Sequence, residues 1–318
     1  MADQILANDL QELFHAGIER AGRHWLAFFR DRPADPDEWA RLGGHALRAL
    51  SWCADSGRYG ELATDLVLAL EWHVMYLGHW HEWESSLRHV SARLGETIDA
   101  ERQILLGGRL ATLCWRLGRS EEALALQQQD YELAVACGDA RLQWGVLEGM
   151  AEAYLNARRF DQALRCAEQA TGLAIAIGDL VEQAASLINA ARALMELGEV
   201  PEVRRRLERA LALAVAAGNI VFEAKARLFL GHAAVAAGDW ALALARFREA
   251  LPLVASYRDE VGRATVLSNI GRALTELGQW DEAAVALEEA IRVLRRHGNT
   301  PAETVVRQRL AALQARRS

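Results

Sequence analysis

The sequence predicts an all-α solenoid, a stack of antiparallel helix pairs preceded by an N-terminal helical cap. Three observations lead to this prediction. The chain of 318 residues contains only five prolines, and its abundant alanine, leucine, arginine and glutamate favour helices. A chain of this length also exceeds what one compact core usually holds. The third observation is that the same short sequence patterns recur every 40 residues through most of the chain.

Residues 1–97 are expected to form the helical cap together with a degenerate first repeat. Apolar residues recur at helical spacing through residues 5–29, and start and stop signals frame a second helix between Asp37 and Gly57. Two more helices are expected on either side of Gly78, which is in register with the turns of the later repeats.

Residues 98–318 are expected to form the solenoid, because two kinds of helix junction alternate along them. The first kind is centred on Gly118, Arg158, Gly198, Gly238 and Gly278. The second kind is Gly138-Asp139, Gly178-Asp179, Gly218-Asn219, Arg258-Asp259 and Gly298-Asn299. Glycine ends a helix in the left-handed conformation, and aspartate or asparagine caps the next helix. Two helix ends in each period therefore predict two antiparallel helices per repeat.

Small residues also recur at fixed places within each repeat. Five residues after the first junction stand Ala123, Ala163, Val203, Ala243 and Ala283. Seven residues later stand Ala170, Ala210, Ala250 and Ala290, whereas Asp130 breaks this pattern in the first full unit. Small side chains at such places allow two helices to approach closely.

These positions resemble the tetratricopeptide repeat, in the subtype with long helices and a Gly-Asp junction. The family's usual period is about 34 residues, so the additional residues lengthen the helices. This subtype occurs in kinesin light chains, cell-polarity scaffolds and bacterial signal-transduction ATPases of the STAND class. The resemblance implies a right-handed superhelix that binds its partners in a concave groove lined by the first helix of each pair.

A second resemblance covers residues 20–95. The segments "RHWLAFF", "EWARLGGHALRALSWCADSG" and "LVLALEWHVMYLGHWHEWESSL" follow one another in the order that is usual in the helical region after the ATPase and winged-helix domains of bacterial STAND regulators. This similarity suggests the sensor and arm region of such a regulator.

The family's groove positions can be carried over onto this sequence by counting back from each first junction. The candidate partner-binding residues are Glu148, Glu152, Asn156, Asn189, Arg192, Glu196, Lys225, His232, Asn269, Arg272 and Glu276. "NAARALMELG" from Asn189 and "NIGRALTELG" from Asn269 are nearly the same text, so that Asn, Arg and Glu recur in register. Asparagine can hold the backbone of a peptide, and arginine can grip a carboxylate. The alternative is that each Arg and Glu form an i, i+4 pair on an exposed helix face.

The stretch "EWHVMYLGHWHEW" at residues 71–83 concentrates three histidines and three tryptophans. His79 and His81 are two residues apart and therefore point to different sides of a helix start, so we expect no metal site. Aromatic packing between the cap and the first repeat is the first interpretation. The alternative is a ligand pocket that contains Trp72 and Tyr76.

No catalytic residues and no cofactor are expected. The chain has a single lysine, Lys225, and therefore no Walker A loop. It also lacks the HExxH, GxSxG and EF-hand motifs. The sequence thus predicts a non-enzymatic protein.

The net charge of −7 gives no argument for binding nucleic acid or an anionic membrane. The four cysteines, Cys53, Cys114, Cys137 and Cys166, have no disulfide-type or zinc-type spacing and are expected to be buried thiols in a reducing compartment. A cytoplasmic protein is therefore expected. The leading function is recognition of a partner protein or peptide, or signal sensing, through the concave groove. The alternative is a small-molecule or peptide-pheromone receptor that uses the aromatic N-terminal pocket.

Overall fold

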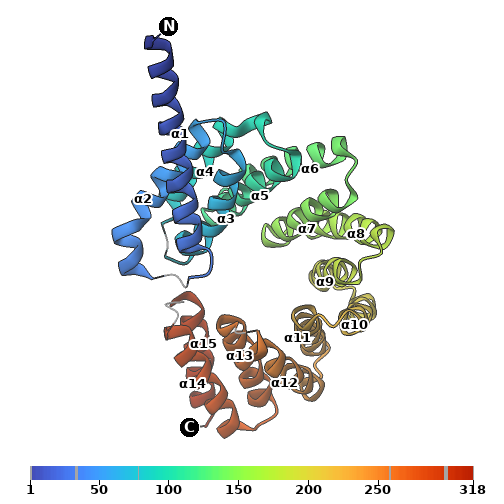
Figure 1. The fold of residues 1–318 in the computed structure, drawn as a ribbon. Coiled ribbons are helices and arrows are strands. Elements are labelled where there is room, and N and C mark those ends of the chain that lie inside the picture. The colour runs from blue at the N-terminus through green and yellow to red at the C-terminus, as the bar shows by residue number, and fades with distance from the viewer. Residues whose placement is uncertain (1, 33–34, 78, 258, 297–299, 318) are drawn as a thin grey trace. The chain divides into compact units, whose positions relative to one another are not determined.

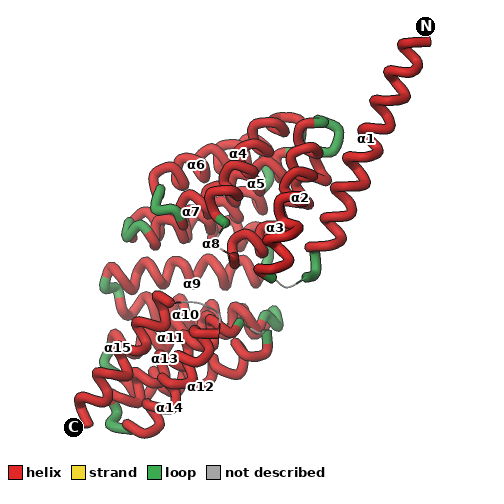
Figure 2. Tube along the Cα trace, turned by 90° about the vertical axis from the view of Figure 1, so that its left-hand side faces the viewer, coloured by secondary structure: helices red, strands yellow, loops and turns green. Residues whose placement is uncertain are grey.

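The computed structural model describes residues 2–32, 35–77, 79–257, 259–296 and 300–317. Within them the chain forms fifteen α-helices and a short 3-10 turn, and no strand (Figures 1 and 2). The all-α arrangement of successive packed helix pairs predicted from the sequence is confirmed. No helix in the described ranges is long and apolar enough to span a membrane.

The chain divides into two compact units, residues 1–153 and 154–318. The first unit contains α1 (Ala2–Phe29), α2 (Pro36–Asp55), α3 (Gly60–Leu77), α4 (Trp80–Leu94), the 3-10 turn Gly95–Thr97, α5 (Ala100–Arg116), α6 (Ser120–Cys137) and most of α7 (Ala140–Asn156). The division at residue 97 expected from the sequence follows the start of the repeats, and it remains a prediction.

The second unit begins within α7 and is also built of consecutive helices. It contains α8 (Phe160–Ile177), α9 (Leu180–Leu197), α10 (Val200–Ala216), α11 (Ile220–Ala236), α12 (Trp240–Ser256), α13 (Glu260–Glu276), α14 (Trp280–Arg296) and α15 (Thr300–Arg317). Each helix packs against the next one in the chain.

The junctions have the backbone that their sequences predict. Gly178 ends α8 with φ 80°, and the side chain of Asp179 accepts hydrogen bonds from the backbone N–H groups of Val181 and Glu182. Left-handed backbone of this kind carries a steric cost for residues with a Cβ. Arg158 adopts it nevertheless, with φ 58°, at the one described junction of the first kind that lacks glycine. The junctions at Gly78, Arg258 and Gly298-Asn299 lie wholly or partly outside the described residues.

The recurring small residues lie where the helices of a pair meet. Ala163, Ala243 and Ala283 have no exposed surface, and the same is true of Ala170, Ala210, Ala250 and Ala290. Larger residues fill the remaining space, for example Phe247 of α12, whose ring lies against Gly231 of α11. These contacts explain the periodic use of alanine and glycine that the sequence shows.

The stretch 71–83 divides between α3 and α4, and several of its aromatic side chains pack in the core of the first unit. His73 is buried, with its ring centroid 4.8 Å from that of Phe29. Trp83 is also buried, and Nε1 of Trp80 donates a hydrogen bond of 3.2 Å to the carbonyl of Met75. Packing is thus confirmed as a role of this stretch, whereas Gly78 lies outside the described residues.

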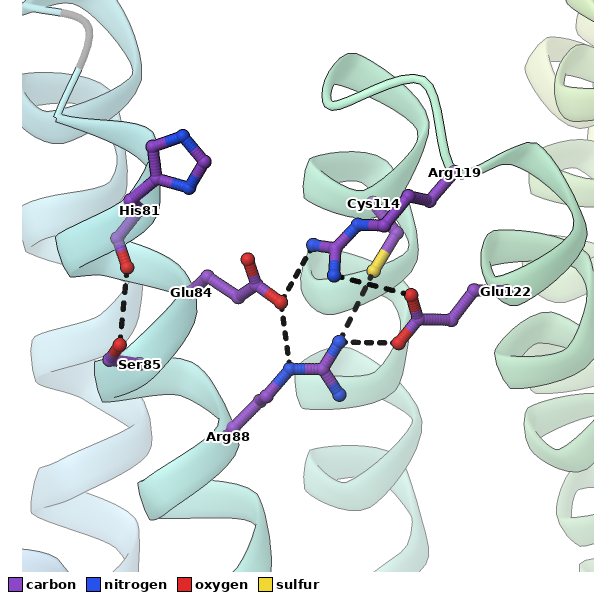
Figure 3. A network of polar contacts seen from close by, with 7 residues as sticks. All are labelled: His81, Glu84, Ser85, Arg88, Cys114, Arg119 and Glu122. Carbon is purple, nitrogen blue, oxygen red and sulfur yellow. Dashed lines mark hydrogen bonds and ion pairs between the residues drawn. The ribbon is translucent and has the colours of Figure 1, made fainter.

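A ring of alternating charges connects α4 with α6 and with the turn before α6 (Figure 3). Nε of Arg88 donates to Glu84 at 2.8 Å, and its guanidinium also pairs with Glu122. Arg119, in the turn before α6, pairs with Glu84 at 2.6 Å and with Glu122 at 3.4 Å. The arginine partners hold the pKa of Glu84 below its usual value.

One expectation about the cysteines is wrong. Cys53, Cys114 and Cys166 are buried, but Cys137 is exposed. It is the last residue of α6, where the helix side faces solvent instead of a neighbouring helix. Burial raises the pKa of the Cys53 and Cys166 thiols to about 11.

Candidate functional site

Four helices of the second unit, α9, α11, α13 and α15, lie side by side and share one face (Figure 1). We refer to this face as the odd-helix face, and it carries the side chains of Asn189 and Arg192 of α9, Phe229 and His232 of α11, Asn269 and Arg272 of α13, and Arg309 of α15. Contacts between these side chains link each helix to the next. The face therefore places residues that are far apart in the sequence into one continuous surface.

His232 is the mostly buried centre of the face. Its Nε2 lies 3.0 Å from Nδ2 of Asn269, and its ring makes edge contacts with Phe229 and Phe247 at centroid distances of 5.6 and 5.5 Å. Burial, together with the nearby positive charges of Arg272 and Arg309, lowers the pKa of His232 to about 4. The imidazole is therefore neutral at physiological pH.

Two arginines stand beside this histidine. Arg272 is exposed and lies over the ring of Trp240, with its Cζ 5.3 Å from the ring centroid. Arg309 is half-buried and donates from Nη1 to the hydroxyl of Ser268 at 2.7 Å. Burial lowers the pKa of Arg309, and the positive charge of Arg272 lowers it further. Among the described residues, no carboxylate comes within ion-pair distance of either guanidinium. The arrangement presents two positive charges that an anionic group could neutralise.

The polar residues of α9 repeat part of this arrangement. Nη1 of Arg192 donates to Oδ1 of Asn189 at 2.8 Å, and the guanidinium lies 5.5 Å from the ring centroid of Phe229 on α11. Each arginine of the two related sequence segments thus has an aromatic ring from another helix beneath it, Phe229 of α11 for Arg192 and Trp240 of α12 for Arg272. Aromatic contacts of this kind hold a guanidinium in place while leaving its N–H groups able to bind.

Comparison with protein-family models places the repeats in a known family. A tetratricopeptide-repeat model matches residues 222–296, and a second model of the same repeat matches residues 107–129 and 184–209. The chain carries tetratricopeptide repeats. No curated protein sequence matches it.

Several solved structures share the fold at low sequence identity. A STAND protein with a tetratricopeptide repeat sensor from Pyrococcus horikoshii is 14% identical, with a TM-score of 0.61, and the match covers 85% of this chain and 40% of that protein. A Rap protein complexed with competence and sporulation factor is 12% identical, with a TM-score of 0.57 over 95% of this chain and 98% of that one. NprR in complex with its cognate peptide NprX is 15% identical, with a TM-score of 0.57 over 87% and 80%.

The glutamates of the two related repeats form ion pairs outside their own helices instead of the i, i+4 pairs considered from the sequence. Glu196 lies 3.9 Å from the guanidinium of Arg158, and Glu276 pairs with Arg316 of α15 at 2.9 Å. Both pairs are partly exposed, and pairs of this kind contribute at most about 1 kcal/mol each. The two glutamates thus interact with residues outside their own helices.

The remaining predicted groove residues lie on the first helices of their repeats. Glu148 is half-buried on α7, and Glu152 and Asn156 are exposed on the same helix. Lys225 is exposed on α11, with its Nζ 5.0 Å from the ring centroid of Phe222. The partner-binding role of the whole set remains a prediction.

Trp72, one half of the predicted aromatic pocket, is 62% exposed on the surface of α3. The side chain of Tyr76 lies outside the described part of the chain. A pocket formed by these two residues also remains a prediction.

The carry-over from the repeat family missed Arg309 because α15 precedes no further junction from which to count back. The 40-residue period of the sequence could have identified Arg309. It connects Asn189, Phe229, Asn269 and Arg309, and the structure places all four on the odd-helix face.

Proposed function

We propose that this chain is a non-enzymatic module that binds a partner protein or peptide on the odd-helix face, with Arg272 and Arg309 holding a carboxylate of the partner. The observation that carries the proposal is the pair of guanidinium groups beside neutral His232, with no described carboxylate in ion-pair distance. Half-buried Arg309 is destabilised by the like charge of exposed Arg272 beside it, and a bound carboxylate would attract both guanidinium groups.

The neutral side chains of the face fit an extended peptide. Asn189 and Asn269 offer amide groups to a peptide backbone, and Phe229 supplies apolar surface between them. NprR, a protein with the same fold, is in complex with its cognate peptide in its structure. This likeness is one of fold, and it supports a peptide as the class of partner.

The similarity to the STAND protein supports a place for this module within signal transduction. There the tetratricopeptide repeats form the sensor. We propose the same role here, with the chain acting as the sensor region of a regulator of that type. Joining the chain to the ATPase module of a STAND regulator and measuring hydrolysis with and without a bound peptide would test this assignment. A rate unaffected by the peptide would count against it.

The binding test uses a displayed library of random peptides. Peptides selected on the wild-type chain should share a free C-terminal carboxylate or an acidic side chain. Their affinity should fall at least tenfold for the double variant Arg272→Ala/Arg309→Ala, since charge-assisted hydrogen bonds contribute about 1.5–3 kcal/mol each.

Arg204→Ala/Arg205→Ala is the matched control, because it also removes two arginines from the second unit, and both are exposed on α10. The control variant should bind the selected peptides as the wild type does. Equal affinity of the wild type and the Arg272/Arg309 variant for every selected peptide would refute the proposed site.

A further inference from the structure

Asp130 on α6 occupies a position where the other repeats have alanine. Its counterparts Ala170, Ala210, Ala250 and Ala290 are completely buried between helices. The position opposite it on the preceding helix has a smaller residue than in the later repeats. It is Gly107 on α5, whereas the later repeats have Leu147, Leu187, Arg227 and Leu267. In this repeat an aspartate thus replaces the usual alanine, and a glycine replaces the larger residue opposite it.

The geometry shows that Gly107 makes room for the carboxylate. A Cβ atom on Gly107 would lie 2.2 Å from Oδ1 of Asp130, which is far inside van der Waals contact. Gln127, one turn earlier on α6, lies in the same way against Gly149 of α7, where a Cβ atom would be 2.9 Å from its Nε2. Two polar side chains of α6 are therefore packed against glycines of the two neighbouring helices.

Both polar side chains line a cavity of about 360 Å³ between α5, α6 and α7. Ile104, Leu105, Leu142 and Val146 supply apolar wall. A cavity of this size, mostly apolar with a few convergent polar groups, is typical of a small-molecule site. The first unit contains all of the lining residues.

Two polar side chains of the cavity, those of Asp130 and Gln127, have acceptor atoms without a donor among the described residues. Asp130 and Gln127 are each only 9% exposed. No described residue donates a hydrogen bond to the carboxylate of Asp130 or to Oε1 of Gln127. Burying such acceptors without a donor is costly, and burial raises the pKa of Asp130 to about 7. Simple packing does not explain this arrangement, because alanine at the same position serves the other repeats.

The missing donors define the ligand. The acceptors without a donor are the two carboxylate oxygens of Asp130 and Oε1 of Gln127, so a ligand that satisfies them must present several N–H or O–H groups. An ammonium group has three donors and a positive charge. A divalent cation fits less well, because no group of three or more His, Cys, Asp or Glu side chains in the described ranges is arranged to hold a metal ion. The charged groups Glu101, Arg109 and Arg141 also line the cavity, and Arg109 pairs with Glu71 at 3.2 Å.

We infer that the cavity between α5, α6 and α7 binds a small molecule with a primary ammonium group, which Asp130 holds as counter-ion and Gln127 as acceptor. The apolar wall takes a short alkyl chain attached to the ammonium. This site is distinct from the odd-helix face, and it would give the chain a small-molecule input in its first unit.

The test measures thermal unfolding of the full chain with n-butylammonium chloride and with tetramethylammonium chloride at equal concentrations. Butylammonium should raise the unfolding midpoint of the full chain by about 2 °C at tenfold its dissociation constant. Tetramethylammonium has no N–H donor and should leave the midpoint unchanged. Equal shifts with the two salts, or no shift with either, would overturn the proposal.

Two variants and one spectrum locate the effect. Asp130→Asn should fold because it keeps the shape of the side chain, and Asp130→Ala should fold because it restores the residue of the later repeats. Both variants should lose the butylammonium shift, because both remove the carboxylate. Glu132→Gln, on the exposed side of the same helix, should keep it. In a ¹H–¹⁵N correlation spectrum, butylammonium should move the amide signals of Gly107 and Gly149. A shift that survives in Asp130→Asn would place the ligand elsewhere and reject the assignment.

Discussion

Nδ2 of Asn269 on α13 lies 3.0 Å from Nε2 of His232 on α11. An amide nitrogen can only donate, so that Nε2 of the imidazole must be an unprotonated acceptor. The contact therefore favours the neutral form of His232 within the second unit. Burial and the charges of Arg272 and Arg309 favour the same form.

This neutral histidine predicts that the second unit loses stability in mild acid. The pKa of His232 is about 4 in the folded chain, against 6.5 as its ordinary value. The unfolded chain therefore takes up a proton first as the pH falls. The contribution of neutral His232 is complete above about pH 6.5 and is lost between there and pH 4, with on the order of 2 kcal/mol gone by pH 5. Denaturant unfolding at pH 7 and pH 5 measures this loss.

His232→Gln provides the comparison for the acid effect, because its side chain cannot take up a proton in this range. The variant should be less stable than the wild type at pH 7, since the aromatic packing with Phe229 and Phe247 is lost. The difference between variant and wild type should narrow toward pH 5. A constant difference across this range would show that the folded and unfolded forms of His232 have the same pKa.

Asp130 predicts the opposite pH dependence in the first unit. Its pKa is about 7 in the folded chain, against an ordinary value of 3.8. The stability is therefore full at low pH and falls as the pH rises through 7, because the buried carboxylate must then carry a charge. Asp130→Asn should stabilise the chain at pH 8 by roughly 3–5 kcal/mol, and much less near pH 4. Equal stabilisation at both pH values would mean that the carboxylate does not titrate between them.

The helices and their junctions could be predicted from the sequence because they depend on local signals that recur with a fixed period. Gly178 ends α8 through its left-handed backbone, and Asp179 caps α9 through its side chain. The buried alanines, such as Ala163 and Ala243, follow from the same period because each repeat packs in the same way. The all-α fold could therefore be predicted almost completely.

The candidate sites could be predicted only in part, because they depend on which side chains meet across helices. The 40-residue step gives Arg272 its place on the first helix of a repeat, but not the ring of Trp240 beneath it. Asp130 was visible in the sequence as a break in the alanine pattern. Its meaning needed the glycine opposite and the cavity beside it, and these come from different helices.

The contact between Gly107 and Asp130 can be tested with a double-mutant cycle. Gly107→Ala should destabilise the wild type by about 1–3 kcal/mol, because its Cβ atom would collide with the carboxylate. In the Asp130→Ala background the same change should be stabilising, since alanine is favoured over glycine in a helix by about 1 kcal/mol. Gly108→Ala is the matched control, because nothing lies within 4 Å of its Cβ position. Additive effects of the two changes would show that the residues are not coupled.

Ala243 of α12 tests the close helix contact that recurs in every repeat. It has no exposed surface, and Ala283, in the same place one repeat later, has none either. Ala243→Leu must push three more carbon atoms into this contact, and it should lower the free energy of unfolding by about 1–3 kcal/mol. Leu242, the preceding residue, is 41% exposed, so that Leu242→Met should change stability by less than about 0.5 kcal/mol.

Valine stands at the equivalent position 203 and is almost completely buried, which shows that α9 and α10 leave room for two more methyl groups there. Ala243→Val should therefore cost less than Ala243→Leu, and urea denaturation of the three variants would give this order. A fully stable Ala243→Leu would mean that α11 and α12 can separate without loss, against the close packing described here.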